Sequence, residues 1–223
     1  MRGALAATAL AAAAWTALVR AGTTTGLDDW AISHVMPGLD PRHPGRDDAV
    51  ALVGLWRPFP LGASWWMKLL DAYQYPASVL LSACLVALAG AALLRRGRRR
   101  AALAWAGAWV VANAVELAGK HGLARPPLHW TNGVERVRVE AFDHAYPSGH
   151  AARAVLVAAL VATVWPRLRR PAAAWTALVP VSLVVSAAHA VSDAVGGLLL
   201  GMLLLVVVRS VPEDPRTSPE RGS

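Results

Sequence analysis

The chain has 223 residues, of which 56% are hydrophobic and only 16% are charged. A soluble domain usually carries about 25% charged residues, so this composition argues against an ordinary soluble enzyme and favours a membrane protein. The formal net charge is +8, and the single cysteine, Cys84, excludes an intramolecular disulfide and a cysteine metal cluster.

Six apolar segments have about the length that crosses a membrane, which is roughly 20 residues. They are residues 4–19, 76–94, 101–119, 148–165, 172–189 and 193–208. The first can also be read as a secretory signal peptide, although no clear cleavage motif follows it. We therefore predict an all-α, polytopic membrane protein, a six-transmembrane-helix bundle. Residues 1–211 would form one membrane-embedded domain, and the charged, proline-rich residues 212–223 a disordered cytoplasmic tail.

Clustered arginines predict the orientation of this bundle. They lie in residues 95–100, between the second and third segments, and in residues 167–170, between the fourth and fifth. Basic clusters can bind nucleic acid, but short basic loops between apolar spans typically mark the cytoplasmic side. We therefore expect a multi-pass protein of the cytoplasmic (inner) membrane with both termini inside.

Two longer loops, residues 21–75 and 120–146, then face the extracytoplasmic side. The first contains four tryptophans, which favour the membrane interface. We predict short interfacial helices in these outer loops, for example over residues 49–56.

Several polar residues fall at the outer ends of the predicted spans. They are Lys120, Ser148, Gly149, His150, His189 and Asp193. Because ionisable groups at membrane depth are costly, they usually serve a function. The topology was derived from apolar length and arginine loops alone, so this convergence on one face is independent evidence of a site.

These residue types suit phosphoryl transfer. A neutral imidazole such as His189 can attack phosphorus, and a carboxylate four residues later, Asp193, can fix its tautomer. A second imidazole, His150, can protonate the leaving alkoxide and then activate water. Ser148 and Gly149 follow a proline at a helix start, where backbone N–H groups can hold an anion.

The segments 147–150 (Pro-Ser-Gly-His) and 189–193 (His-Ala-Val-Ser-Asp) resemble the second and third signatures of the type-2 phosphatidic acid phosphatase family. Lys120 followed by Arg125-Pro126 resembles its first signature, and the similarity covers roughly residues 101–201. The resemblance implies a six-helix membrane bundle and a metal-independent active site without a cofactor.

The same resemblance implies a role for each matching residue. His189 would form a phosphohistidine, oriented by Asp193, and His150 would be the general acid and base. The phosphate would bind to Lys120, Ser148 and Gly149.

The chain departs from the family pattern at two arginines. The Arg-Pro pair at Arg125 comes two residues early, and Leu183 stands where the third signature has arginine. We hypothesise that Arg125 and Arg153 bind the phosphate in their place, Arg153 lying one helical turn after His150. Alternatively, Arg153 pairs with a structural carboxylate. Glu116 is expected to pair with Lys120 rather than act as a base.

The predicted function is hydrolysis of a phosphomonoester or pyrophosphate on a membrane lipid at the extracytoplasmic face. Polyprenyl pyrophosphate, phosphatidylglycerol phosphate and phosphatidate remain open as substrates. The alternatives are a lipid-linked phosphotransferase, a non-catalytic phospholipid-binding membrane protein, and a channel or small transporter. Expected partners are the lipid phosphate and membrane lipids, and no nucleic acid.

Overall fold

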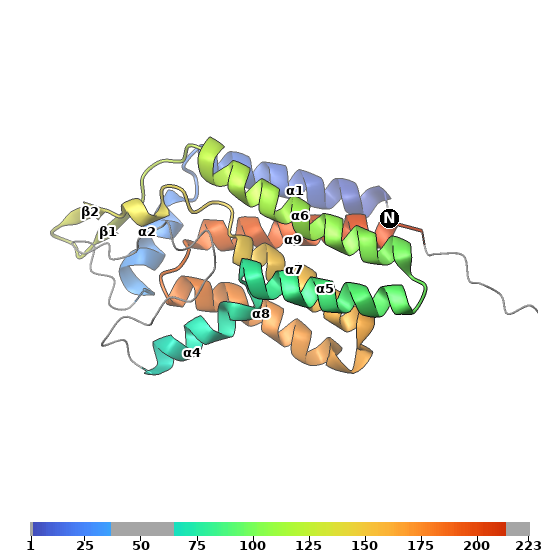
Figure 1. Ribbon diagram of the computed structural model, residues 1–223. Coiled ribbons are helices and arrows are strands. Elements are labelled where there is room, and N and C mark those ends of the chain that lie inside the picture. The colour runs from blue at the N-terminus through green and yellow to red at the C-terminus, as the bar shows by residue number, and fades with distance from the viewer. Residues whose placement is uncertain (1, 37–64, 213–223) are drawn as a thin grey trace, which may run out of the picture.

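The computed structural model describes residues 2–36 and 65–212, which form one helical bundle (Figure 1). Each of the six predicted segments corresponds to a helix. These helices are α1 (Arg2–Arg20), α5 (Val79–Arg95), α6 (Arg99–Gly122), α7 (Gly149–Val164), α8 (Arg169–Val185) and α9 (Val191–Ser210). Among the described residues, α1, α6 and α9 are long and apolar enough to cross a membrane, and α5 and α7 are shorter apolar helices. The prediction of transmembrane helices is thus confirmed, while six full spans stay a prediction.

Two further helices belong to the outer loops, α2 (Thr25–His34) and α4 (Trp65–Gln74). Figure 1 shows both at one end of the bundle, opposite the turns that carry the basic clusters. Short helices therefore occur in the first outer loop, as predicted. The helix expected at 49–56 and the tail from 213 onward lie outside the described residues.

A small β-hairpin also lies at this end, which the all-α prediction missed. Strands β1 (His129–Thr131) and β2 (Arg136–Arg138) pair antiparallel, with Trp130 opposite Val137. The turn between them contains Asn132-Gly133, and Gly133 adopts a φ of 90°. An Asn-Gly pair between two β-prone runs is a strong hairpin signal, so the sequence did contain this information.

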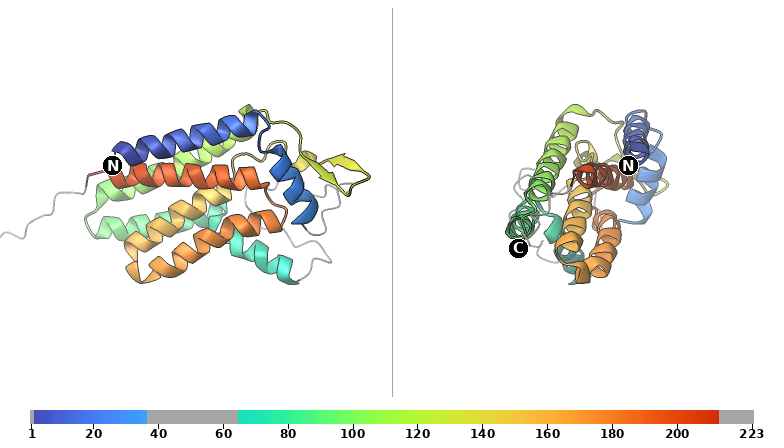
Figure 2. Two further views of the ribbon diagram at one scale, coloured as in Figure 1. Left: turned by 180° about the vertical axis from the view of Figure 1, so that it is seen from behind. Right: turned by 90° about the vertical axis from the view of Figure 1, so that its right-hand side faces the viewer.

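Helix α7 is the centre of the bundle and packs against α5, α6, α8 and α9. Apart from His150, Arg153 and Thr163 its residues are apolar, and most of them are buried, which fits a helix that neighbouring helices cover on all sides. The end view in Figure 2 shows α5 and α6 on one side of the bundle and α1 on the other. The residues at the start of α7 are therefore held inside the protein.

Helix α1 packs along α9 and contacts Tyr146, three residues before α7. The indole Nε1 of Trp15 donates to the carbonyl oxygen of Ser192 at 3.0 Å. The hydroxyl groups of Thr16 and Tyr146 lie 2.8 Å apart and share a hydrogen bond. The first helix thus supports the loop that precedes α7 and the first turn of α9.

Helix α9 approaches the start of α7 so closely that glycine is required. A Cβ atom added at Gly197 would overlap the carbonyl oxygen of Ser148 and the Cβ atom of Ala151. Because both neighbours are backbone or short side-chain atoms, neither can move aside without shifting a helix.

Gly197→Ala should therefore destabilise the protein by about 1–3 kcal/mol. At roughly 2–4 °C per kcal/mol for a chain of this size, the thermal unfolding midpoint in detergent should fall by several degrees. Gly107→Ala is the matched control, because a Cβ atom there meets nothing within 4 Å. Equal midpoints for the two variants would contradict this account of the α7–α9 contact.

Candidate active site

His189 lies in the turn between α8 and α9, at the junction of the fifth and sixth predicted segments. Helix α8 ends at Val185, and the backbone N–H of His189 donates to the carbonyl oxygen of Leu183 at 3.2 Å. The carboxylate of Asp193 caps α9 by accepting the N–H of Ala190 at 3.0 Å. This capping turn places His189 Nδ1 3.7 Å from Asp193 Oδ2. The spacing of four residues thus brings His189 and Asp193 together through the capping turn at the start of α9.

The second histidine of the predicted pair lies beside the first. His150 is the second residue of α7, and the centroids of the His150 and His189 rings lie 6.4 Å apart. Ser148 is the N-cap of α7, and its Oγ accepts the N–H of Ala151 at 3.4 Å. Its own N–H donates to the carbonyl oxygen of Asp193 at 3.0 Å, which joins the starts of α7 and α9. The second and third signature segments therefore form one site.

Arg125 is also part of this site, but it contacts carboxylates. Its buried guanidinium donates from Nη1 to Asp193 Oδ1 at 2.6 Å. From Nη2 it donates to Asp28 Oδ2 at 2.9 Å and to Ser192 Oγ at 3.2 Å. Asp28 comes from α2 and is completely buried. No sequence motif marks Asp28, because nothing in the order of residues places an outer-loop helix against the third signature.

Arg153 has a carboxylate partner as well. Only 1% of this residue is exposed, and its Nε donates to the carbonyl oxygen of Ala77 at 2.7 Å. Its Nη1 donates to Asn113 Oδ1 at 2.9 Å and to Glu116 Oε2. Arg153 therefore pairs with the carboxylate of Glu116, and its role in phosphate binding stays a prediction.

Glu116 joins two of the predicted phosphate-binding cations. Besides Arg153, it accepts a hydrogen bond from Lys120 Nζ at 2.8 Å, as the spacing of four residues predicts. Its carboxylate lies against the backbone of Gly149, where any Cβ atom would overlap it. The cationic group of Lys120, Glu116 and Arg153 thus packs directly against the start of α7.

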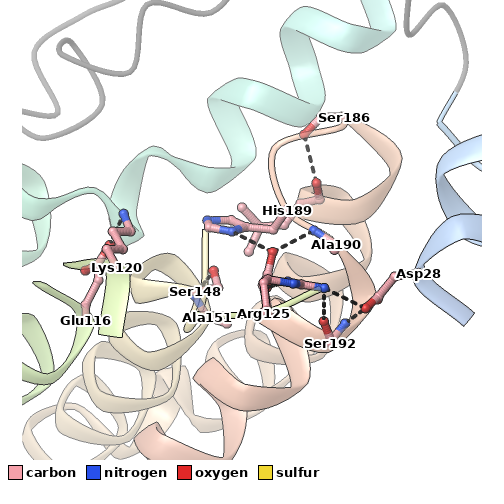
Figure 3. Close-up of polar contacts among 12 residues, drawn as sticks. Asp28, Glu116, Lys120, Arg125, Ser148, Ala151, Ser186, His189, Ala190 and Ser192 are labelled. Atoms are coloured by element: carbon pink, nitrogen blue, oxygen red, sulfur yellow. Dashed lines mark hydrogen bonds and ion pairs between the residues drawn. The ribbon is translucent and has the colours of Figure 1, made fainter. Parts of the chain in front are cut away.

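Two charged groups therefore flank the histidines. Figure 3 shows Lys120 and Glu116 on one side of Ser148, and Arg125 and Asp28 on the other side. The first group has two cations and one carboxylate. The second, made of Arg125, Asp28 and Asp193, has one cation and two carboxylates. The first group is suited to hold a phosphate and the second to stabilise a histidine that becomes positively charged.

Two buried side-chain atoms within the described residues lack a hydrogen-bond partner, and both belong to this site. They are Arg125 Nε and His189 Nδ1. Buried polar atoms are nearly always paired, so such exceptions typically occur where a protein binds a ligand or carries out chemistry. Over residues 2–36 and 65–212, no group of three His, Cys, Asp or Glu side chains is placed to hold a metal ion.

The departure at Leu183 has a packing explanation. Its side chain is buried in an apolar cluster with Ala77, Ala151, Ala154 and Val179. An arginine at this position would place a charge in that cluster, so the surrounding residues are matched to leucine.

Residues 101–216, slightly more than half of the chain, match the PAP2 superfamily. No curated protein matches the chain in sequence. Among solved structures, the fold is similar to the crystal structure of the first transmembrane PAP2 type phosphatidylglycerolphosphate phosphatase from Bacillus subtilis. The similarity has a TM-score of 0.62 at 18% identity and covers 92% of this chain and 94% of the other. The chain is therefore a membrane protein that belongs to the PAP2 superfamily, the family that its signature residues predict.

Proposed function

We propose that this protein is a lipid phosphatase that hydrolyses a phosphomonoester or pyrophosphate on a membrane lipid through a phosphohistidine intermediate. One observation carries the proposal: the rings of His150 and His189 lie 6.4 Å apart, between a cationic group and an anionic group. Family membership supports phosphatase chemistry, and the apolar helices support a lipid substrate.

In the proposed first step, the phosphoryl group binds with its oxygens toward Lys120, Arg153 and the N–H groups at the start of α7. His189 attacks phosphorus, so that a nitrogen–phosphorus bond forms while the bond from phosphorus to the lipid oxygen breaks. His150 gives its proton to that leaving oxygen. The positive charge on the His189 ring is stabilised by Asp193, whose Oδ2 needs only a small approach to accept a hydrogen bond from Nδ1.

In the second step, the neutral His150 takes a proton from water as the water oxygen attacks phosphorus. The nitrogen–phosphorus bond breaks, inorganic phosphate is released and His189 returns to its starting form. Both steps use only water and groups of this protein, so we propose a mechanism that requires no metal ion. Arg125 binds Asp193, and its remaining Nε can donate to a phosphoryl oxygen as charge develops there in the transition state, so we assign Arg125 to the chemical step.

The site lies at the end of the bundle opposite the basic turns (Figure 1). Basic turns typically face the cytoplasm, so we place the reaction at the extracytoplasmic face of the inner membrane. Since the similar structure from Bacillus subtilis is described as a phosphatidylglycerolphosphate phosphatase, phosphatidylglycerol phosphate is the first substrate to test.

The proposal is tested by measuring phosphate release in detergent from phosphatidylglycerol phosphate, phosphatidate and a polyprenyl pyrophosphate. The assay contains excess chelator, and we expect full activity on at least one of these lipids. Activity that disappears with chelator and returns with a divalent cation would disprove the metal-independent mechanism. Binding of the lipids without any phosphate release would favour the non-catalytic alternative.

A further inference from the structure

Asp28 is a buried carboxylate that the mechanism above does not use. It lies in α2, outside the apolar helices and outside the residues that match the family. Both of its oxygens accept hydrogen bonds, Oδ1 from the N–H of Ser192 at 2.9 Å and Oδ2 from Arg125 Nη2 at 2.9 Å. Burial raises the pKa of Asp28, while Ser192 and Arg125 act in the opposite direction. A buried charge is costly without such partners, so this contact between an outer-loop helix and the site is a specific one.

The contacts of Asp28 lead directly to the proposed nucleophile. Arg125 binds Asp28 through one terminal nitrogen and Asp193 through the other, at 2.9 and 2.6 Å. Because the guanidinium group is planar and rigid, fixing one of these nitrogens also fixes the direction of the other. Asp193 in turn keeps its second oxygen toward Ala190 and His189.

We propose that Asp28 is a positioning residue of the active site: it holds Arg125 against Asp193 and thereby keeps the carboxylate that orients His189 in place. This proposal rests on the lipid phosphatase function proposed above. Asp28 also adds the second negative charge of the anionic group, which stabilises His189 when phosphorylation makes its ring cationic. Asp28 does not contact the substrate, so its effect belongs to the chemical step and not to binding.

The neighbouring Asp29 provides a matched control. It lies on the same helix but contacts the hairpin, where its Oδ1 accepts the N–H of His129 at 2.7 Å. Its Oδ2 lies 3.6 Å from Arg136 Nη2. Loss of the Asp29 charge therefore affects the attachment of α2 to the hairpin without touching Arg125 or Asp193.

We expect Asp28→Asn to lower kcat for lipid-phosphate hydrolysis roughly 10- to 100-fold, as is typical for a residue that holds a catalytic group in place. KM should stay within about threefold of the wild-type value, since the interactions that the substrate makes equally in the ground state and the transition state are unchanged. Asp29→Asn should leave both constants near wild type. Wild-type kcat in folded Asp28→Asn, or a rise in KM at constant kcat, would overturn the proposal.

A second variant keeps the test decisive if Asp28→Asn does not fold. Asp28→Glu retains the charge beside Arg125 but displaces it by one methylene, so kcat should fall by a smaller factor, again at constant KM. Asp29→Glu is its control, and unchanged kcat in folded Asp28→Glu overturns the proposal. The wild-type assay separates this result from failure of the proposed function: an inactive wild type removes both proposals, whereas an active wild type with fully active Asp28 variants removes only this one.

Discussion

Replacing His189 with alanine should abolish lipid-phosphate hydrolysis, lowering kcat by at least about 10³-fold while the protein stays folded. The imidazole would form the bond to phosphorus, and its Nδ1 is one of the two buried nitrogen atoms without a hydrogen-bond partner in the described chain. Alanine offers no nucleophile, so neither hydrolysis nor a covalent intermediate should remain. The measurement is phosphate release in detergent, together with transfer of labelled phosphate from the lipid to the protein.

The control is His34→Gln, a change of an exposed histidine in α2 whose ring contacts its own helix at Trp30. This variant should keep the wild-type rate and the wild-type yield of labelled protein. A folded His189→Ala variant that still hydrolyses the lipid at a comparable rate would rule out the phosphohistidine mechanism. It would also direct attention to His150 as the other candidate nucleophile.

Replacing Arg153 with methionine should lower kcat/KM by roughly 10²- to 10³-fold, as expected when a donor to the developing charge is removed. The same change leaves Glu116 buried without its closest cation, which should cost about 3–5 kcal/mol of stability. Activity and stability therefore fall together in the single variant. The measurements are initial rates over a range of lipid concentrations and thermal unfolding midpoints.

The double variant Glu116→Gln/Arg153→Met separates these two effects. It removes both charges, so much of the lost stability should return, because no buried charge is left unpaired. The lost activity should not return if Arg153 binds the phosphate. Recovery of both stability and activity would instead show that Arg153 is only a structural partner of Glu116.

The helices could be predicted from the sequence because a membrane-spanning helix needs a long apolar segment, and the basic loops indicate the orientation of each helix. The site residues His150, His189 and Asp193 were brought together by the same argument. The local geometry at His189 could not be predicted in the same way, because apolar length does not distinguish the end of α8 from the capping turn that follows it. The predicted pair is close in space because the side chain of Asp193 caps α9 next to His189.

The carboxylate partners of Arg125 and Arg153 could not be predicted from the sequence. Arg153 could be recognised as a buried cation, but its carboxylate lies 37 residues away on another helix. Asp28 lies 97 residues from Arg125, in a loop whose path no pattern predicts. Contacts of this kind depend on how helices pack, and packing is decided by the shapes of many side chains together.

The contacts of α1 and α2 with the site have a consequence for how the chain can be processed or shortened. A protein trimmed to the residues that match the family would keep every signature residue, yet lose Asp28 beside Arg125 and Trp15 beside Ser192. The alternative reading of the first apolar segment as a cleaved signal would remove the same tryptophan. The N-terminal helices α1 and α2 therefore contact the candidate site directly, and we expect a shortened protein to need both of them for activity.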